Sequence, residues 1–256
     1  MRIPFEHPLS GSERGPGGEV FTNAILSLPL GVHQSLMLHP WTLTPDEAVA
    51  LQTELAGRVE LCPLGPVRTV AGCDIAYDTF APVLHAAVVV VRLPDLVEVE
   101  RAVVRAEAAF PYVPGLLSFR ECPALLSAVA ALRRVPDVLM VDGQGVAHPR
   151  RFGLACHLGL WLDRPVVGCA KTWLVGDHAE VGPNAGDATP LTLDGETVGA
   201  VVRTADGVRP CYVSPGHRCD VDSAVGLVRQ VLSGFRHPVP TRLAHMAANE
   251  ARAADG

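Results

Sequence analysis

Two aspartates in the sequence each follow a run of apolar residues, which is where α/β proteins gather ligand-binding groups. Asp74 follows residues 70–73, and Asp142 follows residues 139–141. A carboxylate there bears a large desolvation cost, and two on neighbouring strands repel each other unless a magnesium ion lies between them. Taken singly, Asp74 is better explained as a strand-edge residue in water, and Asp142 equally well by an Asp-Gly turn. Taken together, they predict a metal site.

Three further polar residues have the chemistry to act at the same edge of a sheet. Glu121 stands just before Pro123, at the predicted entrance of a helix, where a carboxylate also complements the helix dipole. Lys171 ends the apolar run at residues 166–170, and His217 lies in a Gly-Pro loop. A lysine there can steady a phosphoryl oxygen, and a histidine can move a proton. For each residue alone, the simpler explanation is favoured: dipole complementarity, a solvated lysine and a loop histidine.

An aromatic loop and a basic cluster point to nucleic acid as the partner of this chemistry. Tyr112 lies in the stiff loop at residues 111–115, where a ring could replace the stacking lost when a base is flipped out. Without context, a tyrosine that anchors its loop on the core is the better explanation. His148, Arg150 and Arg151 are predicted to open a helix. Basic residues oppose the dipole there, which favours a function in gripping backbone phosphates.

Apolar spacing and turn residues predict alternating helices and strands around these positions. The expected elements are a helix from residue 44 to 59, strands at 67–77, 83–93 and 96–106, a helix at 123–134, a strand at 138–141, a helix at 151–162, strands at 166–170, 197–203 and 210–213, and helices at about 220–232 and 241–253. Three antiparallel strands followed by alternating helices and strands predict an α/β fold with a mixed sheet flanked by helices.

The bulk properties restrict the class of protein. The net charge of -6 argues against a protein that coats nucleic acid nonspecifically, although carboxylates that hold metal contribute to that total. The cysteines are scattered and never paired as CxxC, which argues against zinc and against a disulfide framework. No dinucleotide-binding or P-loop motif follows a strand. No apolar run is long enough to cross a bilayer, so we expect a cytoplasmic protein without a membrane partner, and a monomer by default.

The chain is expected to form one folded domain preceded by an extension. Residues 1–40 are irregular and rich in Gly and Pro, which predicts a flexible N-terminal extension. Residues 41–256 have the apolar content for one core, so they are expected to form a single catalytic domain.

Five blocks of the sequence, taken in order, resemble the endonuclease V family. They are Gly72-Cys73-Asp74 with Tyr77, residues 112–121, residues 141–151, residues 168–171 and residues 213–218. The resemblance extends from about residue 44 to residue 249. It implies a ribonuclease-H-like fold and a magnesium-dependent hydrolase, with Mn²⁺ as a possible substitute. The implied metal-binding residues are Asp74, Glu121 and Asp142, and the implied assistants at the scissile phosphate are Lys171 and His217.

The resemblance also implies how a substrate is recognised. Tyr112 would belong to a wedge, Arg150 and Arg151 would contact phosphates, and His148 would lie beside the metal. The pocket for a flipped hypoxanthine would be lined by Gly115, Leu117, Gly143, Gly145 and Ala170, with Leu154 nearby. The implied activity is DNA repair: the enzyme recognises deoxyinosine, which is deaminated adenine, and hydrolyses the second phosphodiester bond on its 3′ side, leaving a 3′-hydroxyl and a 5′-phosphate. The alternatives are an inosine-specific endoribonuclease with the same site and a noncatalytic nucleic-acid-binding relative.

Overall fold

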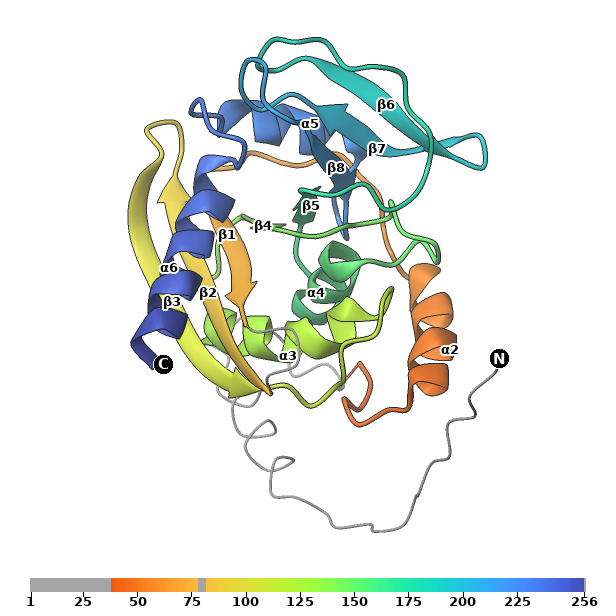
Figure 1. Ribbon diagram of the computed structural model, residues 1–256, viewed down its shortest axis with the longest axis vertical. Coiled ribbons are helices and arrows are strands. Elements are labelled where there is room, and N and C mark those ends of the chain that lie inside the picture. The colour runs from red at the N-terminus through yellow and green to blue at the C-terminus, as the bar shows by residue number, and fades with distance from the viewer. Residues whose placement is uncertain (1–37, 78–81, 256) are drawn as a thin grey trace, which may run out of the picture.

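The computed structural model describes residues 38–77 and 82–255, and a mixed eight-stranded sheet runs through this part of the chain (Figure 1). The strands are β1 (Thr69–Ala76), β2 (Val83–Arg92), β3 (Val97–Glu107), β4 (Val138–Val141), β5 (Val166–Ala170), β6 (Ala188–Leu193), β7 (Glu196–Val202) and β8 (Cys211–Pro215). Their order is β3-β2-β1-β4-β5-β8-β7-β6, with β1, β4 and β5 parallel and the other pairs antiparallel. The predicted α/β class with a mixed sheet is confirmed.

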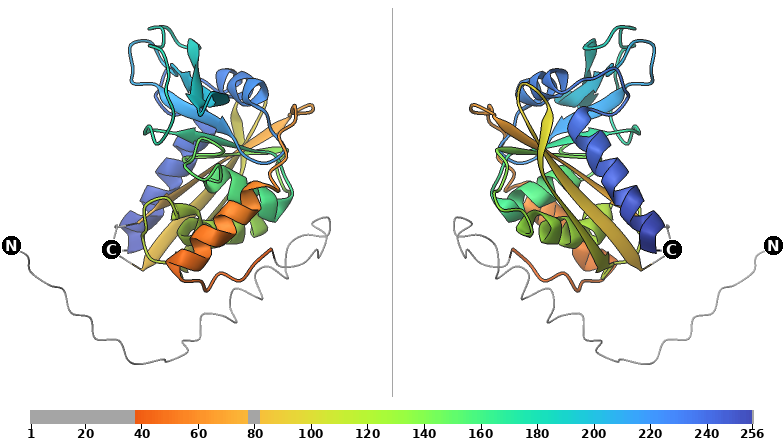
Figure 2. Two further views of the ribbon diagram at one scale, coloured as in Figure 1. Left: turned by 90° about the vertical axis from the view of Figure 1, so that its right-hand side faces the viewer. Right: turned by 90° about the vertical axis from the view of Figure 1, so that its left-hand side faces the viewer.

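Helices cover both faces of the sheet (Figure 2). They are α2 (Pro45–Ala56), α3 (Leu117–Ala130), α4 (Leu154–Leu162), α5 (Val221–Gln230) and α6 (Val239–Asp255). Side chains alternate between the faces along β2, so Ala86 and Val88 pack in the core shared with α3 and α4, whereas Ala87 and Val89 pack against α6. Because the sheet is buried on both faces, the sequence of β2 is an almost continuous run of apolar residues.

The register of β1 and β4 brings the two predicted aspartates together. The strands run parallel with Cys73 opposite Val141, and the backbone N–H of Asp142 donates to the Cys73 carbonyl at 3.3 Å. Asp74 and Asp142 are therefore neighbours at one edge of the sheet. Gly72 lets α6 pack directly on β1 beside them, because a Cβ at this residue would lie only 1.9 Å from the carbonyl oxygen of a proline in the first turn of α6.

Several predicted boundaries were wrong. Helix α3 begins at Leu117 rather than near Pro123, because the preceding turn leads straight into it, so Glu121 lies inside the helix instead of at its entrance. Helix α4 begins at Leu154, so the basic cluster precedes the helix and does not oppose its dipole. Strand β6 was not predicted. Arg151, the predicted first residue of helix α4, has a φ of 55°, which is a left-handed conformation that does not occur inside a right-handed α-helix.

The predicted N-terminal extension falls almost wholly outside the described residues. Leu38 and His39, which we assigned to it, are packed on the domain: His39 is buried, and its Nε2 lies 2.7 Å from Nε2 of His157 on α4. No helix in residues 38–77 and 82–255 is long and apolar enough to cross a membrane.

Candidate active site

Three carboxylates lie near one another where the pairing of β1 with β4 ends. Asp74 and Asp142 come from these adjacent strands, and Glu121 comes from α3, which packs against β1. Burial and the charge of Asp142 raise the pKa of Asp74. Burial and the charges of both aspartates raise the pKa of Glu121 to about 8. Buried carboxylates that repel one another in this way are typical of functional sites.

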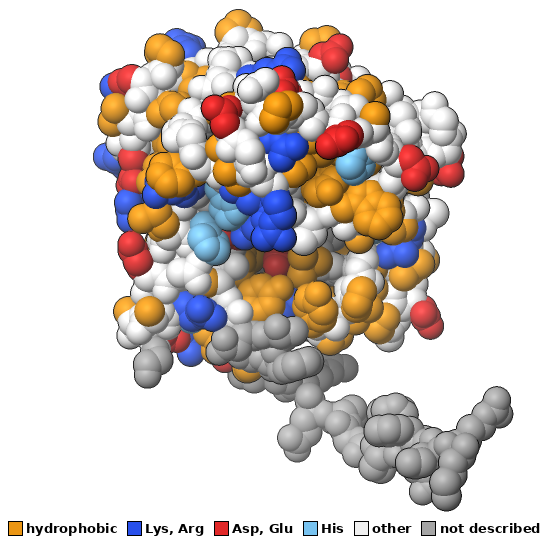
Figure 3. All heavy atoms as spheres, turned by 45° about the horizontal axis from the view of Figure 1, so that its top comes forward, with side chains coloured by type: hydrophobic (Ala, Val, Ile, Leu, Met, Phe, Trp, Pro, Cys, Tyr) orange, Lys and Arg blue, Asp and Glu red, His pale blue; other side chains and the backbone are white. Residues whose placement is uncertain are grey.

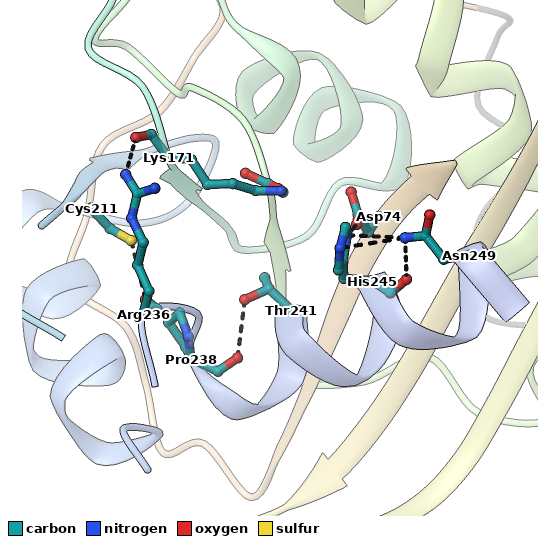
Figure 4. Close-up of polar contacts among 9 residues, drawn as sticks. Asp74, Lys171, Cys211, Arg236, Pro238, Thr241, His245 and Asn249 are labelled. Atoms are coloured by element: carbon teal, nitrogen blue, oxygen red, sulfur yellow. Dashed lines mark hydrogen bonds and ion pairs between the residues drawn. The ribbon is translucent and has the colours of Figure 1, made fainter. Parts of the chain in front are cut away.

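The Asp74 carboxylate contacts a histidine that the sequence analysis did not single out. His245 on α6 has its Nδ1 2.6 Å from Asp74 Oδ2, and the side-chain amide of Asn249 donates to the His245 carbonyl at 2.8 Å (Figure 4). The contact exists because α6 lies directly on β1. The available signal was weak: His245 and Asn249 stand four residues apart, on a helix whose apolar residues Ala244 and Ala248 face the sheet.

The Asp142 carboxylate is paired with the predicted lysine. Lys171 follows β5, which runs parallel to β4, and its Nζ lies 2.6 Å from Asp142 Oδ2. The guanidinium of Arg236 donates to the Lys171 carbonyl at 2.5 Å and fixes the backbone there (Figure 4). The Lys171 side chain is 32% exposed and that of Asp142 is 14% exposed, so the pair is half-shielded but open to a substrate. On this face of the molecule, basic and histidine side chains gather around a hollow that contains an acidic one (Figure 3).

The donor chemistry of this edge fits a hard divalent cation. Carboxylate oxygens are the ligands that Mg²⁺ and Mn²⁺ prefer, and a cation among Asp74, Glu121 and Asp142 would offset the repulsion that, together with burial, raises the pKa values of Asp74 and Glu121. Among residues 38–77 and 82–255, no three His, Cys, Asp or Glu side chains form a ready-made metal site. Each carboxylate is instead turned to its own partner, and that of Glu121 is the Tyr77 hydroxyl, which donates to it at 3.1 Å.

The predicted catalytic role of His217 is wrong on geometric grounds. The backbone N–H of Val166 donates to the His217 carbonyl at 3.1 Å, so His217 lies at the start of β5, whereas Lys171 follows its end. A strand rises about 3.3 Å per residue, so the two ends are roughly 13 Å apart. The His217 imidazole is buried, accepts from the Glu60 N–H at 3.2 Å and lies 3.5 Å from Asp163. It ties loops together at the far end of the sheet.

The predicted wedge loop is a β-turn with an exposed aromatic ring. The N–H of Leu116 donates to the Val113 carbonyl at 2.9 Å, Pro114 and Gly115 occupy the central positions, and Gly115 has a φ of 79°. This is the pattern of a type II turn, in which the third residue needs a positive φ. Tyr112 is 47% exposed, so its ring is free to contact a ligand.

Three side chains converge on the Gly115 carbonyl. Gln52 Nε2 lies 3.1 Å from this oxygen, Arg150 Nη2 2.9 Å and His148 Nε2 3.1 Å. Burial and the neighbouring Arg150 charge lower the pKa of His148 to about 4, so its ring is neutral. Since the Arg150 N–H lies 3.2 Å from His148 Nδ1, both ring nitrogens of His148 are engaged within the protein. The structure therefore places His148 and Arg150 under the turn.

Arg151 is also committed to the protein. Its guanidinium donates to the Leu193 carbonyl at 3.0 Å and pairs with Glu196 at 3.3 Å and Asp194 at 3.6 Å. All three partners belong to the β6–β7 hairpin. The predicted phosphate contact is therefore not what Arg151 makes in this structure.

The residues predicted to line the base pocket divide into two groups. Gly115, Leu117 and Gly143 are partly exposed, whereas Gly145, Leu154 and Ala170 are buried. Gly143 lies against Leu154, since a Cβ on the glycine would be 3.1 Å from that leucine side chain. The N–H of Gly145 donates to a buried serine hydroxyl at 2.7 Å, so it is not available to a base. Helix α3 has no side-chain cap at its start, just before Leu117.

Known proteins match this chain over most of its length. A family model described as Endonuclease V matches residues 53–246. An endonuclease V of Gloeobacter violaceus is 47% identical over 234 residues, covering 90% of this chain and 95% of the relative. The crystal structure of endonuclease V from Streptomyces avermitilis has a TM-score of 0.79 at 41% identity, covering 90% of this chain and 98% of that one. The endonuclease V of Ciona intestinalis in complex with an inosine-containing 23mer DNA has a TM-score of 0.74 at 24% identity, covering 84% and 100%.

Proposed function

This chain belongs to the endonuclease V family, and on that premise we propose that it recognises deoxyinosine in DNA and hydrolyses the second phosphodiester bond on its 3′ side. The observation that carries the proposal is the gathering of Asp74, Glu121 and Asp142 with Lys171 at one edge of the sheet. The inosine-containing DNA bound by the Ciona intestinalis relative supports the substrate. An inosine-specific endoribonuclease with the same site is the second candidate.

The proposed cofactor is Mg²⁺, with Mn²⁺ as a substitute, held by Asp74, Glu121 and Asp142. The observation that supports this donor set is that burial and the charges of neighbouring carboxylates raise the pKa values of Asp74 and Glu121. When bound, such a cation activates water and stabilises charge on the leaving oxygen. His217 is not part of this proposal, and His245 joins the site as the partner of Asp74.

The side chains around the carboxylates position the scissile phosphate. Lys171 Nζ carries a positive charge that is oriented by Asp142 and can stabilise a phosphoryl oxygen. His245 lies against Asp74 and can hold or pass a proton at its ring nitrogens. The Tyr77 hydroxyl holds the Glu121 carboxylate in place.

Base recognition is assigned to the turn and to the start of α3. The exposed Tyr112 ring can replace stacking when a base leaves the helix. The uncapped start of α3 at Leu117 and the partly exposed Gly143 offer backbone groups to the base. The 6-oxo group of hypoxanthine accepts a hydrogen bond where the amino group of adenine donates one, so an N–H in this position would penalise adenine.

The domain organisation and the cysteines suggest the setting in which the enzyme acts. Residues 41–256 would act as one catalytic domain, in a monomer. All seven cysteines lie in the described part of the chain and are free thiols there. Free thiols suit a reducing compartment, so we place the enzyme in the cytoplasm.

The decisive experiment uses a labelled duplex with one deoxyinosine, incubated with the protein in Mg²⁺ or in EDTA. We expect a magnesium-dependent nick one nucleotide beyond the 3′ side of the lesion and no cut in the undamaged duplex. A matched strand with inosine in RNA runs in parallel. Faster cutting of that RNA would establish the endoribonuclease, and equal cutting of the undamaged duplex would overturn lesion recognition.

A further inference from the structure

The Gln52 side chain belongs to a fully satisfied polar network under the Tyr112 turn. Only 1% of Gln52 is exposed. Its Nε2 donates to the carbonyls of Gly115 at 3.1 Å and Phe152 at 2.6 Å, and its Oε1 accepts from Nε of Arg150. Two carbonyls face one end of the amide and a guanidinium faces the other, so its orientation is determined by its partners. Gln52 lies on α2, a helix outside the blocks that carry the family resemblance.

The Arg150 guanidinium faces this network. Its Nη2 donates to the Gly115 carbonyl at 2.9 Å, and its Nε donates to Gln52. A Cβ on Gly115 would lie 2.9 Å from Arg150 Nη2, which shows how closely the guanidinium approaches the turn. Hydrogen bonds from a charged donor are about twice as strong as neutral ones. The Arg150 charge therefore stabilises a protein carbonyl.

We propose that Gln52 and Arg150 are positioning residues for base recognition. They hold the Gly115 carbonyl, and with it the Tyr112 turn, in the conformation that admits a flipped base. The inference rests on the proposed function for its substrate, and it adds α2 and a reassigned arginine to the recognition site.

The geometry of the turn explains why it needs this support. Within the turn itself, one hydrogen bond, from the Leu116 N–H to the Val113 carbonyl, closes the loop. The Gly115 carbonyl lies in the same planar peptide unit as the Leu116 N–H, so a rotation of this peptide would break the closing bond and shift Leu117 at the start of α3. A misplacement of about 1 Å near a reacting group can cost about a hundredfold in rate. Donors on the Gly115 oxygen prevent the rotation.

The test compares Arg150→Lys and Gln52→Leu with Arg151→Lys as the control, since Arg151 is a neighbouring arginine that donates to a different carbonyl. Affinities for a deoxyinosine duplex and an undamaged duplex are measured in Ca²⁺ and in EDTA at several salt concentrations. We expect Arg150→Lys and Gln52→Leu each to reduce the preference for deoxyinosine about ten- to a hundredfold. The double variant should lose no more than either single one, because the two residues act as a unit. The control should keep its preference.

Salt dependence separates the proposal from a phosphate contact. Loss of one phosphate contact reduces the slope of log affinity against log salt by about 0.9. A positioning residue makes no phosphate contact, so its substitution should leave the slope unchanged. Arg150→Lys with full preference would overturn the proposal, as would Arg150→Ala with a reduced slope and an unchanged preference.

Hydrogen exchange distinguishes failure of this inference from failure of the proposed function. The Leu116 amide, which closes the turn, should exchange at least about tenfold faster in Arg150→Lys and Gln52→Leu than in Arg151→Lys. If the wild type shows no preference for deoxyinosine, the proposed function fails, while faster exchange still supports the network as a brace for the turn. Unchanged exchange in both variants rejects the network itself, whatever the substrate.

Discussion

Two parts of the site differ in how well their charged and polar groups are stabilised. The first is the carboxylate edge, formed by Asp74, Glu121 and Asp142, and the second is the Gly115 network, formed by Gln52 and Arg150 around the Gly115 carbonyl. At the edge, Glu121 is buried and Asp74 and Asp142 are partly buried, and burial together with mutual repulsion raises the pKa of Asp74 and Glu121. In the network, each polar atom of the Gln52 amide has a partner, and the Arg150 charge is used on a carbonyl. The carboxylate edge therefore lowers the stability of the folded state, whereas the Gly115 network raises it.

The difference separates two functions that the site needs. Catalytic groups gain by being held in an unfavourable environment, because the missing stabilisation is then supplied on binding. A recognition loop gains by being rigid before the ligand arrives, because less ordering is needed on binding. Substitutions in the two regions should therefore have opposite effects on stability.

The largest effect is expected from Glu121→Gln. The amide removes a buried charge and can still accept from the Tyr77 hydroxyl, so the free energy of unfolding at about pH 8 should be unchanged or higher. Nicking of the deoxyinosine duplex should fall at least about a hundredfold, because a proposed metal ligand is lost. Gln52→Leu is the counterpart and should lower the free energy of unfolding by about 1–3 kcal/mol. Chemical denaturation and nicking assays on both variants check the contrast. Destabilisation by Glu121→Gln would show that the edge is not strained.

A smaller effect distinguishes the two histidines. His245→Ala removes the partner of Asp74, and nicking should fall about ten- to a hundredfold. His217→Ala breaks contacts at the other end of the sheet, so nicking per folded molecule should stay within about threefold while stability falls by about 1–2 kcal/mol. Rates corrected for the folded fraction at 25 °C give the comparison. A large loss of nicking in folded His217→Ala would restore it as a catalytic residue.

The sequence predicted the parts of the site that depend on local signals. An aspartate that follows an apolar run is recognisable from a few residues, and the β1–β4 register placed Asp74 beside Asp142 as expected. The turn at Gly115 is equally local, since Pro-Gly at its centre specifies the conformation. The mixed sheet followed from the order of its elements.

Contacts made by packing between distant segments were missed or misassigned. His245 reaches Asp74 because Gly72 lets α6 lie on β1, a contact between residues 171 apart in the chain. Arg150 has the charge of a phosphate ligand, and only the fold shows that Gln52 lies beneath it. His217 lies in one of the sequence blocks that resemble the family, but the fold places it at the start of β5, at the opposite end of that strand from Lys171.

The smallest expected effect is a change of Tm with pH, which tests whether the carboxylate edge is strained. The pKa of Glu121 is raised from 4.5 to about 8, so the folded protein keeps a proton that the unfolded chain releases. The contribution of Glu121 to stability is thus fully present below about pH 4.5 and is lost as the pH rises toward about 8. Asp74, whose pKa is also raised, acts in the same direction. Without divalent cations, the Tm of the wild type should fall across this window by more than that of Glu121→Gln.

Magnesium should reverse this trend, because it binds the deprotonated carboxylates and only the folded state brings them together. Mg²⁺ should therefore raise the Tm of the wild type by a few degrees at about pH 8.5 and by less at about pH 6. The same scans on Glu121→Gln should show a smaller shift that depends less on pH, while Arg151→Lys, far from the carboxylates in its contacts, should match the wild type. An equal magnesium shift at both pH values would mean that the cation binds elsewhere, and the contrast between a strained catalytic edge and a satisfied recognition network would then lose its electrostatic basis.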